Sequence, residues 1–122
     1  MRPAGRTFRP HLISFMLPDI TPEALHAAQL AGQSFTLIDV REPEEYAYCQ
    51  LPGSVLLPLS ELPTRAAEVP TGSPVVLICH HGVRSAQALA YLQQRHGHQN
   101  LLNLRGGIHA WSLRIDPSVP VY

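Results

Sequence analysis

The chain has 122 residues, of which 45% are hydrophobic and 15% charged, and nine basic residues balance nine acidic ones. This length suits one domain with a substantial core, and this composition is typical of a globular protein and excludes a disordered one. All nine basic residues are arginines, which excludes lysine-based chemistry such as Schiff-base formation, and the neutral balance argues against general nucleic-acid binding.

Residues 1–17 are expected to form an N-terminal extension. Residues 1–10 contain three arginines and no acidic residue, and the apolar patch that follows is short and interrupted by Ser14 and Pro18. This pattern argues against a signal peptide, and no apolar run approaches the roughly 18–20 residues that span a bilayer. Two cysteines argue against a disulfide framework, so we expect a cytoplasmic protein. A native start at Met16 is an open alternative.

Helices and strands are expected to alternate along residues 18–122. Thr21 is a typical N-cap, Pro22 suits the first helical position, and Gly32 is a typical C-terminal breaker, which predicts a helix over Pro22–Leu30. The further expected elements are a strand at 35–40, a helix at 42–49, a strand at 55–57, one or two helical turns at 60–67 interrupted at Pro63, a strand at Val75–Ile78, a helix at 85–95, a strand at 100–104 and a helix at 108–113.

This alternation predicts an α/β fold. Connections of this kind favour a parallel sheet covered by helices on both faces. Ligand sites in such sheets lie beyond the carboxyl ends of the strands. Residues 18–122 are therefore expected to form one domain, with its site at that edge of the sheet.

Cys79 follows a buried strand and precedes a helix. The first amide N–H groups of a helix have no intrahelical partner, and together with the helix dipole they form a cradle for an anion. A cysteine in this position is predicted to be a nucleophilic thiolate near neutral pH. The alternative interpretation is an inert cysteine packed in the core.

Four motifs occur in an order that points to a known family. They are LIDVREPEEY at residues 37–46, LPGSV at 51–55, CHHGVRS at 79–85 and NLRGGIHAW at 103–111. Together they resemble the rhodanese-like sulfurtransferases, from about residue 19 to the C-terminus. The resemblance implies the rhodanese-like fold, a small α/β domain with a central parallel sheet, and we expect no cofactor.

The resemblance also implies a reaction. Cys79 would attack the outer sulfur of a donor such as thiosulfate and become a persulfide, and cyanide or a thiol would then remove that sulfur. The partners would be these small molecules, with a protein as a further possible acceptor, and neither nucleic acid nor membrane. The alternative function is a persulfide carrier or interaction module that delivers sulfur to a partner protein.

The position of Arg84 separates sulfur transfer from phosphatase chemistry. Protein tyrosine phosphatases place an arginine six positions after the cysteine, where its guanidinium binds phosphate at two points. Six positions after Cys79 is Ser85, and Arg84 comes one residue earlier. Phosphatases and arsenate reductases that share the rhodanese fold have a similar loop that is one residue longer. The shorter loop favours a single sulfur atom over a tetrahedral oxyanion.

The substrate-binding segment implied by the resemblance follows Cys79 directly. Its residues are His80, His81, Gly82, Val83, Arg84 and Ser85. Arg84 is expected to supply positive charge for an anionic donor, Gly82 to give the loop backbone freedom, and Ser85 to act as an N-cap. No metal is expected, because adjacent side chains on a tight loop rarely point at one ion. His80 and His81 are expected to tune the thiolate or contact the substrate.

Supporting residues are expected around this loop. Asp39 and Arg41 lie where their strand ends, which favours structural hydrogen bonding or ion pairing over direct chemistry. The pair Gly106-Gly107 predicts a close approach of the backbone to the site. Trp111 is expected to anchor the core.

Cys49 is the second thiol of the chain. The family commonly has Gly-His where this chain has Cys49 and Gln50. We expect Cys49 to be a half-buried residue at the end of a helix. In the alternative, Cys49 resolves or relays sulfur, and a disulfide with Cys79 would then form under mild oxidation.

Overall fold

A parallel five-stranded sheet forms the centre of the computed structural model, which describes residues 18–122. The strands are β1 (Asp19–Ile20), β2 (Thr36–Asp39), β3 (Val55–Leu56), β4 (Val75–Ile78) and β5 (Leu101–Leu104). Their spatial order is β1-β5-β4-β2-β3, so β4 lies in the middle between β2 and β5. The expected N-terminal extension, with the alternative start at Met16, lies outside the described residues.

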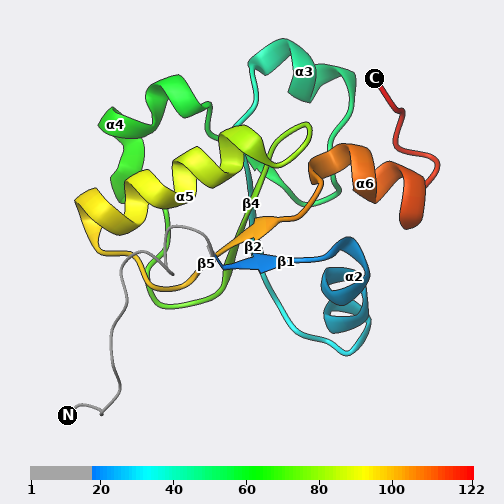
Figure 1. Ribbon diagram of the computed structural model, residues 1–122, viewed down its shortest axis with the longest axis horizontal. Coiled ribbons are helices and arrows are strands. Elements are labelled where there is room, and N and C mark those ends of the chain that lie inside the picture. The colour runs from blue at the N-terminus through cyan, green and yellow to red at the C-terminus, as the bar shows by residue number, and fades with distance from the viewer. Residues whose placement is uncertain (1–17) are drawn as a thin grey trace.

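Helices cover both faces of this sheet (Figure 1). They are α2 (Pro22–Leu30), α3 (Pro43–Tyr48), α4 (Leu62–Arg65), α5 (Val83–His96) and α6 (Gly107–Arg114), with 3-10 turns η1 (Leu59–Glu61) and η2 (Ala66–Glu68) beside α4. Helices α2 and α6 contact each other on one face, and α5 with the α4 segment covers the other. Within residues 18–122, no helix is long and apolar enough to cross a membrane.

The side chains of β4 alternate between two core clusters. Val75 and Leu77 pack with residues of α5 such as Leu89. Val76 and Ile78 pack with the opposite cluster, which contains buried residues of α2 and α6. All four side chains are fully buried, which explains why a central parallel strand is apolar without interruption. The expected α/β fold with helices on both faces of a parallel sheet is therefore confirmed.

The elements mostly follow the sequence patterns, with three differences. Helix α4 begins at Leu62 with Pro63 in its first turn, where a missing N–H costs no hydrogen bond, so Pro63 does not interrupt it. Strand β1 was not expected, because its two residues are defined only by pairing with β5. Helix α5 begins at Val83 with Gly82 as its N-cap, so the predicted N-cap role of Ser85 is wrong.

Candidate active site

Cys79 lies at the carboxyl end of β4, in a tight turn that leads into α5. Its Sγ accepts a hydrogen bond from the backbone N–H of Gly82 at 3.0 Å and lies 3.3 Å from Oγ of Ser85. Gly82 has a φ of 101°, a left-handed conformation that favours glycine and points its N–H back toward the sulfur. Cys79 is only 1% exposed. The turn therefore directs donors at a sulfur that is shielded from water.

Ser85 lies inside the first turn of α5, where its hydroxyl has two neighbours. It contacts the Sγ of Cys79 and the Oδ1 of Asn103 on β5. The side-chain amide of Asn103 donates to the carbonyl of Gly82 at 3.1 Å, which orients Oδ1 toward Ser85. A hydroxyl carries one proton. Ser85 can therefore turn its proton from Asn103 to the sulfur when that sulfur becomes an anion.

The turn between β5 and α6 lies directly against the cysteine loop. The N–H of Ile108 donates to the carbonyl of Cys79 at 2.9 Å, and the N–H of His109 donates to the carbonyl of His80 at 3.0 Å. Gly107 has a φ of 64°, and a Cβ there would collide with both of those carbonyl groups. The predicted close backbone approach is thus present, and it fixes the loop from outside its own segment.

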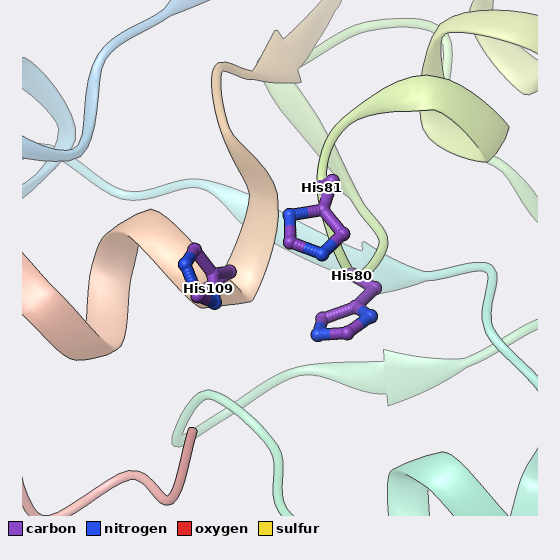
Figure 2. A group of neighbouring side chains, drawn as sticks. All are labelled: His80, His81 and His109. Atoms are coloured by element: carbon purple, nitrogen blue, oxygen red, sulfur yellow. The ribbon is translucent and has the colours of Figure 1, made fainter. Parts of the chain in front are cut away.

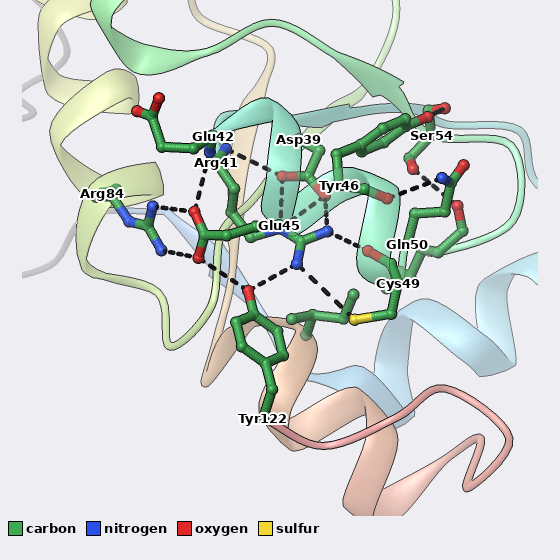
Figure 3. A network of polar contacts seen from close by, with 12 residues as sticks. Asp39, Arg41, Glu42, Glu45, Tyr46, Cys49, Gln50, Ser54, Arg84 and Tyr122 are labelled. Atoms are coloured by element: carbon green, nitrogen blue, oxygen red, sulfur yellow. Dashed lines mark hydrogen bonds and ion pairs between the residues drawn. The ribbon is translucent and has the colours of Figure 1, made fainter.

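Arg84, in the first turn of α5, forms an ion pair with Glu45 of α3 (Figure 3). Two guanidinium nitrogens of Arg84 donate to the two carboxylate oxygens of Glu45, at 2.7 and 3.0 Å. The hydrogen bonds from Arg84 lower the pKa of Glu45 to about 2. In this structure the positive charge of Arg84, which was expected to attract an anionic donor, is therefore balanced by the carboxylate of Glu45.

Arg41 and Asp39 form a second ion pair, which is completely buried. The Nη2 of Arg41 lies 2.7 Å from Oδ2 of Asp39 and donates to the main-chain oxygen of Cys49 at 2.6 Å. Burial disfavours the charge of Arg41, but its hydrogen bonds to Asp39 and Tyr122 outweigh this effect and raise its pKa. The pair thus links the end of β2 to the end of α3. This is the ion pairing that the sequence favoured.

Tyr122 connects the two ion pairs to the cysteine loop. Its hydroxyl accepts a hydrogen bond from Arg41 at 2.7 Å and donates one to Glu45 at 3.0 Å (Figure 3). Its ring stacks on His80 with centroids 3.8 Å apart and planes 3° apart. Its main-chain oxygen lies 2.6 Å from Nε2 of His80. Burial lowers the pKa of His80, and the nearby His81 and His109 lower it further.

Comparison with known proteins decides the family. The model of the family described as "Rhodanese-like domain" matches residues 21–114. This chain belongs to the rhodanese-like domain family. The rhodanese-like domain is 40% identical over 97 residues to a protein named "Sulfurtransferase" from Allochromatium vinosum, and the match covers 80% of this chain and 90% of that protein.

Other relatives share the domain in different settings. The rhodanese-like domain is 36% identical over 97 residues to "Adenylyltransferase and sulfurtransferase MOCS3" from Drosophila ananassae, covering 74% of this chain but only 22% of that protein. A rhodanese-related protein from Thermoplasma volcanium superposes with a TM-score of 0.70 at 32% identity, covering 86% of this chain and 97% of that one. A rhodanese-like domain protein from Staphylococcus aureus gives 0.74 at 28% identity, covering 87% and 99%.

Three histidines of the rhodanese-like domain gather beside the cysteine loop (Figure 2). His80 and His81 come from the loop, with ring centroids 4.0 Å apart. His109 comes from α6, and its ring centroid lies 4.7 Å from that of His81. The sequence singled out the first two residues but not His109, because 28 positions separate it from His81 along the chain.

The two cysteines pack in different clusters. Cys49 is the C-cap of α3 and is 7% exposed, so it is buried rather than half-buried as expected. It belongs to the cluster on the α2 and α6 face, whereas Cys79 belongs to the cluster on the α5 face. Both thiols are free. The relay role of Cys49 and its disulfide with Cys79 stay predictions that this arrangement disfavours.

Some residues of the site were missed at the level of sequence. Asn103 carried a usable signal, because it is a polar residue between apolar neighbours in the expected last strand. Glu45 lies within the LIDVREPEEY motif but has no local feature that pairs it with Arg84. Tyr122 has no signal of its own, because its role depends entirely on where the C-terminal segment lies. The expected anchor Trp111 is 6% exposed and is part of the core.

Proposed function

We propose that this rhodanese-like domain is a sulfurtransferase that moves sulfane sulfur from a donor such as thiosulfate to cyanide or a thiol. The observation that carries the proposal is the environment of the Cys79 sulfur. The N–H of Gly82 and the hydroxyl of Ser85 lie 3.0 and 3.3 Å from Sγ. Such donors stabilise a negative sulfur, as donors in an oxyanion hole stabilise oxygen. The 40% identical relative that is named a sulfurtransferase supports the same activity.

The reaction proceeds in two balanced steps. The thiolate of Cys79 attacks the outer sulfur of thiosulfate, the bond between the two thiosulfate sulfurs breaks, and sulfite leaves with the electron pair. The product on the protein is the Cys79 persulfide anion. Cyanide or an acceptor thiolate then attacks the outer sulfur of the persulfide, which gives thiocyanate or a new persulfide and restores the thiolate. This is covalent, ping-pong catalysis without a cofactor.

The residues that follow Cys79 divide this work in the proposal. Gly82 and Ser85 stabilise the anionic sulfur. The backbone of His80, His81 and Val83 forms the rest of the turn. Arg84 meets the donor only by sharing its guanidinium with Glu45, since the two side chains are paired. Asp39 and Arg41 have a structural role, since they form a fully buried ion pair.

A persulfide carrier that serves a partner protein is the second candidate function. One observation favours it, namely the balanced charge of Arg84. A free dianion is attracted less to a paired arginine than to an unpaired one. Two free thiols fit a reducing compartment such as the cytoplasm for either function.

The deciding experiment measures turnover and sulfur loading in the same samples. Thiocyanate formation from thiosulfate and cyanide is followed for wild type and Cys79→Ala, and intact mass spectrometry detects one added sulfur atom, with Cys49→Ala as the matched control. Turnover that is lost in Cys79→Ala but kept in Cys49→Ala supports the enzyme. A stable persulfide on Cys79 with negligible turnover supports the carrier. Absence of both turnover and loading would contradict both functions.

A further inference from the structure

We propose that His80, His81 and His109 bind one divalent transition-metal ion such as Zn²⁺. One ring nitrogen of each histidine lies within 4.8 Å of those of the other two. The three rings approach one another from two separate elements, the cysteine loop and α6 (Figure 2). No metal was expected from His80, His81 and Cys79, because adjacent side chains on a tight loop rarely point at one ion. In the structure the two loop histidines do approach each other, and α6 supplies His109 as a third nitrogen ligand.

The backbone holds the histidines together before any ion arrives. The N–H of His109 donates to the carbonyl of His80 at 3.0 Å, and the preceding residue, Ile108, makes the equivalent bond to Cys79 at 2.9 Å. Gly107 permits this contact, since any Cβ there would collide with the loop. Because the Cα positions are set by hydrogen bonds, only side-chain torsions must adjust, which reduces the entropic cost of binding an ion.

The spacing is close to that of an occupied site. With Zn–N bonds of about 2.0–2.1 Å, nitrogens around a tetrahedral ion lie roughly 3.4 Å apart. The widest pair must therefore close by about 1.4 Å from the present limit of 4.8 Å. His81 is exposed and free to adjust its torsions. In His109 the Nδ1 atom is buried without a hydrogen-bond partner, and a bound ion or water commonly accounts for such an atom.

The donor set indicates the class of ion. Neutral imidazole suits zinc, copper and nickel, and three protein nitrogens leave a fourth position open. The main-chain oxygen of Tyr122 lies 2.6 Å from Nε2 of His80 and is a candidate fourth ligand. It accepts a hydrogen bond while this nitrogen carries the proton, and it can contact the ion or its water when the nitrogen coordinates. The site lies beside Cys79 but does not use its sulfur.

Zn²⁺ titration by isothermal calorimetry tests the proposal on the untagged full chain at neutral pH. Wild type is expected to bind one Zn²⁺, and His109→Ala to bind at least roughly tenfold more weakly, since one of three ligands is removed. The matched control is His96→Ala, which removes an exposed histidine at the far end of α5 and should bind as wild type does. Cys79→Ser should also retain binding, because the thiol is not a ligand.

Co²⁺ gives an independent spectroscopic readout. A nitrogen-ligated tetrahedral ion is expected to show visible d–d bands without the near-ultraviolet charge-transfer band of a cobalt–thiolate bond. Zn²⁺ binding that is unchanged in His109→Ala, or lost in Cys79→Ser with a thiolate band in the Co²⁺ spectrum, overturns the proposal. So does the absence of stoichiometric binding in wild type. None of these outcomes depends on sulfur transfer, so failure of the metal site would not contradict the proposed sulfurtransferase activity.

Discussion

Arg84 and Glu45 form a two-point ion pair that joins the first turn of α5 to α3. The residues are 39 positions apart in the chain. Glu45 is also bonded by the hydroxyl of Tyr122 and the N–H of Glu42. The side chain of Arg84 remains 33% exposed. The pair therefore balances the cation of the loop while leaving it within reach of a ligand.

Glu45→Gln is expected to strengthen thiosulfate binding. The substitution removes the carboxylate that competes for Arg84, so a dianionic donor gains a charge-assisted contact. We expect the KM for thiosulfate to fall about fivefold, on the order of 1 kcal/mol. Steady-state kinetics check this, with Glu44→Gln, an exposed neighbour on the same helix, as the control. An unchanged KM would show that Arg84 does not meet the donor.

The same ion pair predicts how stability depends on pH. The pKa of Glu45 is lowered from 4.5 to about 2, first of all by its hydrogen bond with Arg84. A carboxyl group with a lowered folded-state pKa stabilises the fold fully above its unfolded value, and this contribution is lost as the pH falls toward the folded value. Thermal melts should show a loss between about pH 4.5 and pH 2 that is smaller in Glu45→Gln. Parallel curves for the two proteins would contradict the assignment.

Gly107→Ala is expected to destabilise the protein strongly. A Cβ at this position would collide with the backbone of Cys79 and His80, in addition to the strain of a φ of 64°. We expect a loss of roughly 3 kcal/mol or more in the free energy of unfolding. Gly32→Ala is the control, since its φ is 89° but nothing lies within 4 Å of its Cβ, and it should cost only about 1–2 kcal/mol. Equal losses in urea denaturation would show that the contact does not matter.

Ser85→Ala is expected to slow sulfur transfer more than it affects folding. The hydroxyl is one of two donors near the Cys79 sulfur, and a hydrogen bond to a charged group contributes about 1.5–3 kcal/mol. Turnover with thiosulfate should therefore fall about tenfold or more. Ser112→Ala removes another buried hydroxyl, bonded to the carbonyl of Ile108, and should keep wild-type turnover. Similar rates in the two variants would exclude Ser85 from stabilising the sulfur.

Much of the fold is readable from local patterns. The helix at Pro22–Leu30 and the strand at Val75–Ile78 have the expected bounds, because a proline at a helix start and a continuous apolar run act over neighbouring residues. The boundary of α5 was less well predicted. Gly82 rather than Ser85 caps it, and the side-chain amide of Asn103 on β5 donates a hydrogen bond to the carbonyl of that glycine, a contact that no local pattern specifies.

The sequence by itself determined the parallel α/β architecture, the position of Cys79 at the end of a buried strand, and the motifs of the rhodanese-like family. These depend on residue periodicity and on spacing within short segments. Only the tertiary structure decided that Glu45 balances Arg84, that Tyr122 stacks on His80, and that His109 joins the loop histidines. Each of these contacts joins residues at least 28 positions apart. Their geometry depends on how the helices and the C-terminal segment pack around the sheet, which no local pattern specifies.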